Sequence, residues 1–136
     1  MKKFLILLIF ACGLRCVASD ALTAFRAGIE GVQKVGPEVL LSAWYLPEEA
    51  PKVEELRQRF NGLSNRLGPV IDSEIFAPKA VGRRLTHLYG VVYFRKRPLW
   101  IRADYYNGDG SGGFLHMEFS LRPDDILPYE LGGAAN

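Results

Sequence analysis

The hydrophobic period of this chain changes at Gly68-Pro69, and that change constrains the fold more than any other feature. Before it, apolar residues recur at spacings of three and four, the period of a helix buried on one side. After it, apolar and polar residues alternate, the period of strands buried on one face. Glycine followed by proline is a typical end of a helix. This order predicts an α+β domain in which helices precede an antiparallel sheet.

Two or three helices are expected before that boundary. Residues 20–34 carry an apolar stripe and are followed by Gly36-Pro37, and residues 38–45 are long enough for a short second helix. A third helix is expected from Pro51 to Leu67, because proline suits the first helical turn. Its apolar stripe consists of Val53, Leu56, Phe60, Leu63 and Leu67. The stripe predicts that this helix packs on a sheet.

Four strands are expected near residues 70–76, 83–94, 98–106 and 114–122, forming a curled antiparallel meander. Their register follows from keeping apolar residues opposite apolar residues. For the last two strands this rule pairs Ile101 with Phe119, Ala103 with Met117, Arg102 with Glu118 and Asp104 with His116. For the hairpin before them it pairs Phe94 with Leu99, Val92 with Ile101 and Gly90 with Ala103.

The alternation then gives the sheet one apolar face and one mixed face. The apolar face is expected to carry the helices and consists of Thr86, Leu88, Val92, Phe94, Ile101, Ala103, Met117, Phe119 and Leu121, with Leu115 on the same side of the last strand. The mixed face consists of Tyr89, Val91, Tyr93, Trp100, Tyr106 and Phe114 around His87, Arg102, Asp104, His116 and Glu118. Aromatic residues rimmed by charges are unusual on a solvated face.

Residues 1–19 have the three-part layout of a secretory signal peptide. Lys2 and Lys3 are positive, residues 4–14 are apolar, and Val17-Ala18-Ser19 offers small residues for cleavage. An apolar helix of that length rises about 16 Å, which is too short to span a bilayer. We therefore expect a secreted or periplasmic protein, cleaved near Ser19, with one domain at residues 20–136 and no membrane contact in its mature form.

Removal of that segment changes the charge and the cysteine content. Three of the 17 Lys and Arg residues lie in it, which leaves 14 against 15 Asp and Glu, a net charge of −1. A domain with that balance lacks the positive field that nucleic-acid binding requires. Both cysteines, Cys12 and Cys16, also lie in the segment. The mature chain is therefore expected to have no disulfide, no thiol chemistry, no zinc site and no cofactor.

The layout of elements resembles the nuclear-transport-factor-2-like superfamily, the cystatin-like α+β cone. The similar parts are residues 57–68 with Leu67-Gly68-Pro69 at the helix end, the strand Tyr89–Phe94 and the strand Trp100–Tyr106. The resemblance implies helices packed on a curled antiparallel sheet. It implies little about activity, because the superfamily includes isomerases, dehydratases, cyclases and non-catalytic binding domains.

Two functions are consistent with this resemblance. The first is a non-catalytic module that binds a small apolar ligand or another protein. Its candidate interface residues are Tyr89, Tyr93, Trp100, Arg102, Tyr106, Phe114 and Glu118, and the simplest partner is a second copy that docks sheet to sheet as a homodimer. The alternative is a small isomerase or dehydratase that uses an Asp104–His116 dyad, with Tyr89 and Tyr106 nearby. The register places that dyad on the mixed face and no ionisable group on the apolar face, which favours the binding module.

One further motif has the spacing of a calcium loop. Asn107, Asp109 and Ser111, followed by Glu118, match the oxygen ligands of such a loop. The flanking elements are expected to be strands, however, and a glycine-rich hairpin loop explains the same residues more simply. No metal site is therefore predicted.

Overall fold

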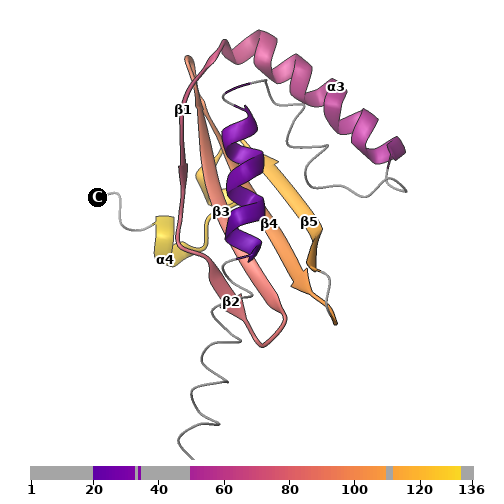
Figure 1. Cartoon of the computed structure of the whole chain (residues 1–136). Helices are drawn as coiled ribbons and strands as arrows, with labels where there is room; N and C mark the ends of the chain where they lie inside the picture. The colour runs from indigo at the N-terminus through magenta and orange to yellow at the C-terminus, as the bar shows by residue number, and fades with distance from the viewer. Residues whose placement is uncertain (1–19, 33, 35–49, 110–111, 133–136) are drawn as a thin grey trace, which may run out of the picture.

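The computed structural model describes residues 20–32, 34, 50–109 and 112–132 (Figure 1). The first element is a helix over residues 20–32. The later elements are α3 (Ala50–Leu67), β1 (Val70–Ile75), β2 (Lys79–Val81), β3 (Leu85–Phe94), β4 (Pro98–Asn107), β5 (Gly112–Ser120), the 3₁₀ helix η2 (Pro123–Asp125) and α4 (Tyr129–Gly132). The predicted α+β class is confirmed, with helices preceding an antiparallel sheet.

The sheet has five strands, one more than predicted. Its order is β1-β3-β4-β5, and β2 pairs with the other end of β3. β1 and β2 therefore lie along the same side of β3, with Phe76–Pro78 between them. Proline has no N–H to donate to a ladder, so a break in the edge at Pro78 is expected. The sheet is open, with β1 and β2 at one edge and β5 at the other.

Both described N-terminal helices follow their predicted apolar stripes. In the helix of residues 20–32, Phe25, Ile29 and Val32 are buried, and in α3 so are Phe60 and Leu67. α3 ends at Leu67 and is followed by Gly68, whose φ of 84° is favourable for glycine and whose N–H donates to the Ser64 carbonyl at 3.0 Å. The short helix predicted for residues 38–45 lies outside the described residues. Within the part of the chain that the structure describes, no helix is long and apolar enough to cross a membrane.

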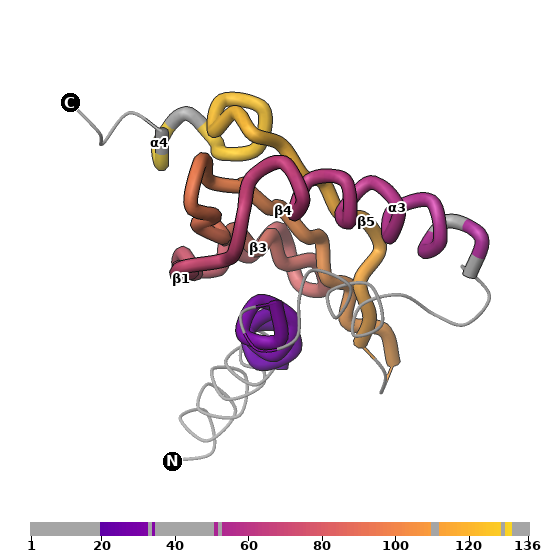
Figure 2. The backbone as a smooth tube through the Cα atoms, turned by 90° about the horizontal axis from the view of Figure 1, so that it is seen from above, coloured from indigo at the N-terminus to yellow at the C-terminus, as the bar shows by residue number. Residues whose placement is uncertain are grey.

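The helix of residues 20–32 lies against the predicted apolar face, here called the inner face (Figures 1 and 2), and the buried residues of α3 pack in the same core. Phe25 lies on Gly90 of β3, where a Cβ would come within 3.1 Å of the phenyl ring. Phe60 of α3 meets Phe119 of β5 edge to face, with ring centroids 4.7 Å apart. These two aromatic contacts place one helix over β3 and the other over β5.

The β4–β5 register is confirmed at all four predicted pairs, including Arg102 opposite Glu118 and Asp104 opposite His116. The β3–β4 register was predicted two residues out of place, since Val92 pairs with Leu99 and Gly90 with Ile101. The Phe94 N–H donates to the Arg97 carbonyl across a two-residue turn. That turn is tied to the end of α3, because the amides of Arg95 and Lys96 donate to Pro69 and Leu67. A slip of two residues keeps each side chain on its face, so hydrophobic patterning alone does not detect it.

A bulge in β5 corrects the predicted position of Phe114. Asp104 pairs with His116 but Tyr105 pairs with Phe114, so Leu115 is the extra residue. Phe114 therefore lies on the inner face, where it meets Tyr105 with ring centroids 5.1 Å apart, and Leu115 is 61% exposed. The sequence predicted the reverse, because an extra residue in a strand inverts the alternation on one side of it.

The opposite face, here called the outer face, is partly covered by the end of the chain. Figure 2 shows the turn after β5 and α4 on the side of the sheet away from the helix of residues 20–32. Tyr89 and Val91 point to this face and are only 4% and 0% exposed. Lys79 Nζ lies 3.5 Å from Glu130 Oε2, which ties α4 to β2. Much of the apolar surface on this face is therefore buried within one chain.

Candidate functional site

The polar residues of the outer face form two rows across β3, β4 and β5. The first row consists of His87, Asp104 and His116, and the second of Tyr89, Arg102 and Glu118. In each row the residues are direct neighbours on adjacent strands, so their side chains lie close enough to interact. Five of the residues in these rows, all but His87, were candidates in the sequence analysis.

The Asp104 carboxylate is bound by His87 and not by His116. His87 Nδ1 lies 2.7 Å from Asp104 Oδ1, and both side chains are half-buried. His116 instead directs Nε2 to Glu118 Oε1 at 3.2 Å, along its own strand. The predicted Asp104–His116 dyad is thus replaced by a His87–Asp104 pair. The sequence analysis missed the His87–Asp104 pair because its register for the β3–β4 hairpin did not place His87 opposite Asp104.

Glu118 is the centre of the second row. Its Oε2 accepts from Arg102 Nη2 at 2.7 Å, while its Oε1 faces His116. The carboxylate of Glu118 therefore neutralises the charge of Arg102 on the neighbouring strand. The predicted pair of Arg102 and Glu118 is therefore formed, and it belongs to a small network and not to an isolated contact.

The two candidate tyrosines do not gather around Asp104. Tyr89 is buried, and burial raises its pKa, with the positive charges of Arg102 and Lys79 acting in the opposite direction. Tyr106 is 40% exposed and hydrogen-bonds Arg84, whose pKa it raises together with Asp109. Tyr93 is half-buried and bonds Glu74, and burial and that carboxylate raise its pKa. Trp100 stacks against Phe76 with ring centroids 6.3 Å apart.

The inner face carries one ionisable residue that the sequence analysis missed. Tyr105 is 8% exposed and packs in the core cluster beside Phe114. Burial raises its pKa, and the negative charge of Asp20 raises it further. The alternation of β4 places Tyr105 on the same face as Ile101 and Ala103, and this was the available signal.

The residues of the calcium-like motif are occupied by other contacts. Asp109 forms an ion pair with Arg84 at 2.9 Å, and Glu118 is bound by Arg102. Asn107 pairs with Gly112 at the start of β5, six residues before Glu118. Ser111 lies outside the described residues. Among the residues that are described, no group of three or more His, Cys, Asp and Glu is placed to hold a metal ion.

A second candidate site is a cleft between α3 and β5. It has a volume of about 230 Å³ and is lined by Leu56, Arg59, Phe60, Leu63, Met117 and Phe119. An adjoining hollow of about 350 Å³ shares Arg59 and Leu63 and adds Gln58, Gly62 and Arg66. The cleft is lined by apolar side chains and Arg59, and the adjoining hollow adds Arg66, a combination that suits small amphipathic ligands.

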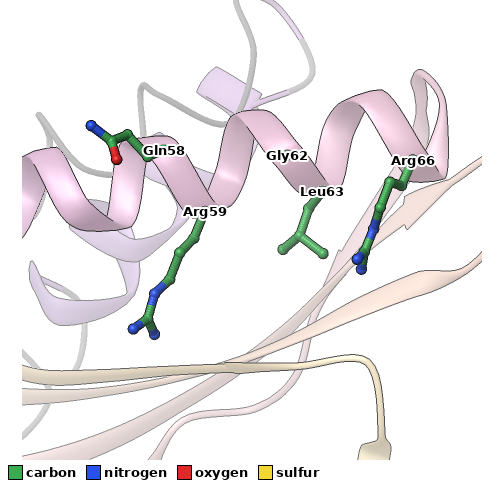
Figure 3. Close-up of a pocket in the computed structure, with 5 residues that line it drawn as sticks. All are labelled: Gln58, Arg59, Gly62, Leu63 and Arg66. Atoms are coloured by element: carbon green, nitrogen blue, oxygen red, sulfur yellow. The ribbon is translucent and has the colours of Figure 1, made fainter.

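Helical geometry places the cationic groups of this cleft together. Arg59, Leu63 and Arg66 are separated by four and three residues, so they share one side of α3. Figure 3 shows all three side chains pointing to the same side of the helix, towards the strands. Arg59 is held by Glu55 at 2.6 Å. Arg66 has no acidic partner within 4.0 Å among the described residues. The sequence predicted the apolar stripe but treated it as core only.

No protein-family model matches this chain, and no curated protein or solved structure matches it either. The function is therefore argued from the geometry of these two sites.

Proposed function

We propose that this chain is an exported, non-catalytic binding module whose ligand site is the cleft between α3 and β5. The observation that supports this proposal is the apolar lining of the cleft together with Arg59 and, in the adjoining hollow, Arg66. Leu56, Leu63 and Phe119 are only partly buried, so the cleft retains apolar surface that a ligand would cover. The outer face offers less exposed apolar surface to a ligand, since Tyr89 and Val91 are already buried within the chain.

The chemistry of the cleft specifies the ligand class. An apolar body would lie between Leu63 and Phe119, and an anionic end would face the guanidinium of Arg66. Arginine recognises carboxylates and sulfonates through paired hydrogen bonds. The ligand is therefore a small amphipathic anion, of which a medium-chain carboxylate is the simplest example.

Binding is tested with anilinonaphthalene sulfonate, a fluorescent probe with an apolar body and one anionic group, and by its displacement with decanoate. Leu63→Glu should weaken probe binding by at least about tenfold, because it places a carboxylate in the apolar part of the cleft. The matched control is Val81→Glu, which changes an exposed valine on β2. Arg66→Gln should weaken decanoate and leave decanol unchanged, while Arg57→Gln, on the same helix, should change neither.

The proposal is wrong if the native fold binds no amphipathic anion, or if Leu63→Glu and Val81→Glu have equal effects. Native mass spectrometry of gently purified protein gives an independent measurement. Added mass that disappears in the Leu63→Glu variant would identify a ligand acquired in the cell.

Export and the cone superfamily belong to the same proposal. Residues 1–19 carry the charge and hydropathy pattern of a signal peptide, and helices on one face of an open antiparallel sheet are compatible with a cone. Expression of the full-length gene followed by N-terminal sequencing tests the first part. Export predicts a mature N-terminus at Asp20, and retention of Met1 would contradict it.

One observation favours a second function, a small enzyme that uses His87 with Asp104. A carboxylate 2.7 Å from an imidazole nitrogen orients the ring, as a general base requires. His87→Ala should then abolish an isomerase or dehydratase activity, whereas His116→Ala should leave it nearly unchanged. If neither variant alters any turnover and stability falls by only about 0.2–1 kcal/mol, the pair is structural.

A further inference from the structure

The two edges of the sheet are protected to different degrees. An edge strand presents unpaired backbone groups, and proteins shield it with charges, proline and bulges. Along β1 and β2, Asp72, Glu74 and Lys79 are exposed, and Pro78 interrupts the edge. The Ser73 N–H already donates to the Asp72 carboxylate at 2.8 Å. These features disfavour the pairing of this edge with another strand.

The β5 edge is less protected, since its shielding consists of the bulge at Leu115 and the charge of Glu118. Within the described residues β5 pairs only with β4. From Gly112 to Ser120 it contains no proline and no lysine, and its polar residues near the centre are His116 and Glu118. Leu115, displaced by the bulge, is 61% exposed. We propose that the β5 edge pairs antiparallel with β5 of a second copy of this chain, forming a twofold homodimer with a continuous sheet.

Backbone geometry limits the possible registers. In a strand, the N–H and C=O of one residue point to the same side, and alternate residues face the same edge. Directly opposed residues in the twofold pair must therefore be an even number of positions apart in the sequence. This leaves registers centred on single residues, and the candidates in the regular part of β5 are those centred on His116, Met117 and Glu118.

Charge selects one of the three. Centring on Glu118 would oppose two carboxylates, and centring on His116 would oppose two imidazoles. Centring on Met117 places His116 opposite Glu118 of the second copy, twice by symmetry. It also brings the exposed Leu115 into the contact, where the second copy would cover it. Opposite charges and apolar pairs across neighbouring strands stabilise a sheet, whereas like charges destabilise it.

The contact differs from the face-to-face homodimer considered from the sequence. That arrangement depended on exposed apolar area on the outer face, and Tyr89 and Val91 are instead buried within one chain. The β5 residues Met117 and Phe119 also line the cleft, so the two proposals are separated by their variants. Leu63→Glu changes α3 and not the β5 edge, and Leu115→Lys changes a residue that does not line the cleft.

Sedimentation equilibrium tests the contact on protein recovered from the host's secretory compartment, over micromolar to millimolar concentrations. A reversible dimer is expected for the unmodified protein. Leu115→Lys should raise its dissociation constant at least about tenfold, because the contact would bury the charged lysine. Ile71→Lys is the matched control, since Ile71 is 64% exposed at a bulge on the other edge, and it should leave the dimer unchanged.

A charge exchange tests the register. His116→Glu should weaken the dimer about tenfold because it opposes Glu118 of the second copy, and adding Glu118→His should restore it. Circular dichroism of each variant verifies the fold. A monomer at all concentrations would overturn the proposal. A dimer whose dissociation constant is unchanged by Leu115→Lys would also overturn it. A dimer that is lost with Tyr106→Lys would instead lie on the outer face. Failure of the exchange to restore the dimer would overturn the register.

Discussion

Replacing Gly90 with alanine tests whether the helix of residues 20–32 packs directly on the sheet. A Cβ at this position would lie 3.1 and 3.3 Å from two carbons of the Phe25 ring and 3.2 Å from the Glu74 carbonyl oxygen. Ordinary van der Waals contact begins near 3.4 Å. The ring is fully buried, and the carbonyl belongs to the backbone of β1, so neither neighbour moves without disturbing its surroundings.

The magnitude follows from two opposing effects. Overpacking of this kind costs about 1–3 kcal/mol, since side chains must leave their preferred rotamers. Alanine in a strand interior recovers about 0.5–1 kcal/mol relative to glycine, because the unfolded chain has fewer conformations. We expect Gly90→Ala to lower the free energy of unfolding by about 1–2 kcal/mol. For a domain of this size that corresponds to a Tm lower by roughly 4–8 °C.

Urea unfolding followed by circular dichroism measures this difference. Gly113→Ala is the control, because no atom lies within 4 Å of its added Cβ and its stability should change by less than about 0.5 kcal/mol. Phe25→Leu should cost less in the Gly90→Ala background than alone, since the shorter side chain relieves the overlap. Equal or greater stability of Gly90→Ala, or an absence of coupling to Phe25, would refute the packing described for this helix.

Three further predictions concern α3, the start of β5 and the buried tyrosines. Phe60→Ala should lower the free energy of unfolding by about 3–5 kcal/mol, because Phe60 is 2% exposed and holds α3 on Phe119; a loss below about 1 kcal/mol by urea unfolding would contradict that anchoring role. Gly112→Ala should cost about 1–3 kcal/mol, since a Cβ there overlaps the ring of Tyr105, and Tyr105→Phe should partly rescue it in thermal melts. Burial raises the pKa of Tyr89, Tyr93 and Tyr105 above the ordinary value of 10.0, so the unfolded chain ionises first. Their contribution to stability should be complete below pH 10.0 and be lost as the pH rises through the folded pKa values; unfolding curves showing no decline in that window would disprove it.

The β4–β5 register was predictable because both faces of these strands distinguish one pairing from another. On one face Ile101 opposes Phe119, and on the other Arg102 opposes Glu118, so any slip separates charges or exposes apolar residues. The β3–β4 register lacked that second constraint. β3 is apolar along much of both faces, and a slip of two residues leaves its pattern intact. In the observed turn, the amides of Arg95 and Lys96 donate hydrogen bonds to Pro69 and Leu67 at the end of α3. The alternation of apolar and polar residues along a strand does not predict such contacts between distant segments.

The bulge at Leu115 was inaccessible for a related reason. Alternation assumes one residue per position, and an inserted residue inverts every assignment on one side of it. Phe114 and Leu115 are both apolar, so the pattern did not reveal which one faces the core. The contact of Phe114 with Tyr105 resolves the choice, and Gly112 permits it by leaving room for the tyrosine ring.

The distribution of ionisable groups between the two faces supports binding over catalysis. His87 and Asp104 lie on the outer face, whereas the cleft lies on the inner face between α3 and β5. The ionisable residue found in the inner core cluster is Tyr105, and burial raises its pKa away from neutrality. Efficient proton transfer near neutral pH requires a group whose pKa lies near the operating pH and within reach of the substrate. A ligand that extends from the cleft into the adjoining hollow would instead meet apolar side chains and the guanidinium groups of Arg59 and Arg66, which bind an anion without exchanging protons with it. The same separation is consistent with the Asp–His pair being a cross-strand contact while the cleft on the other face would take the proposed ligand.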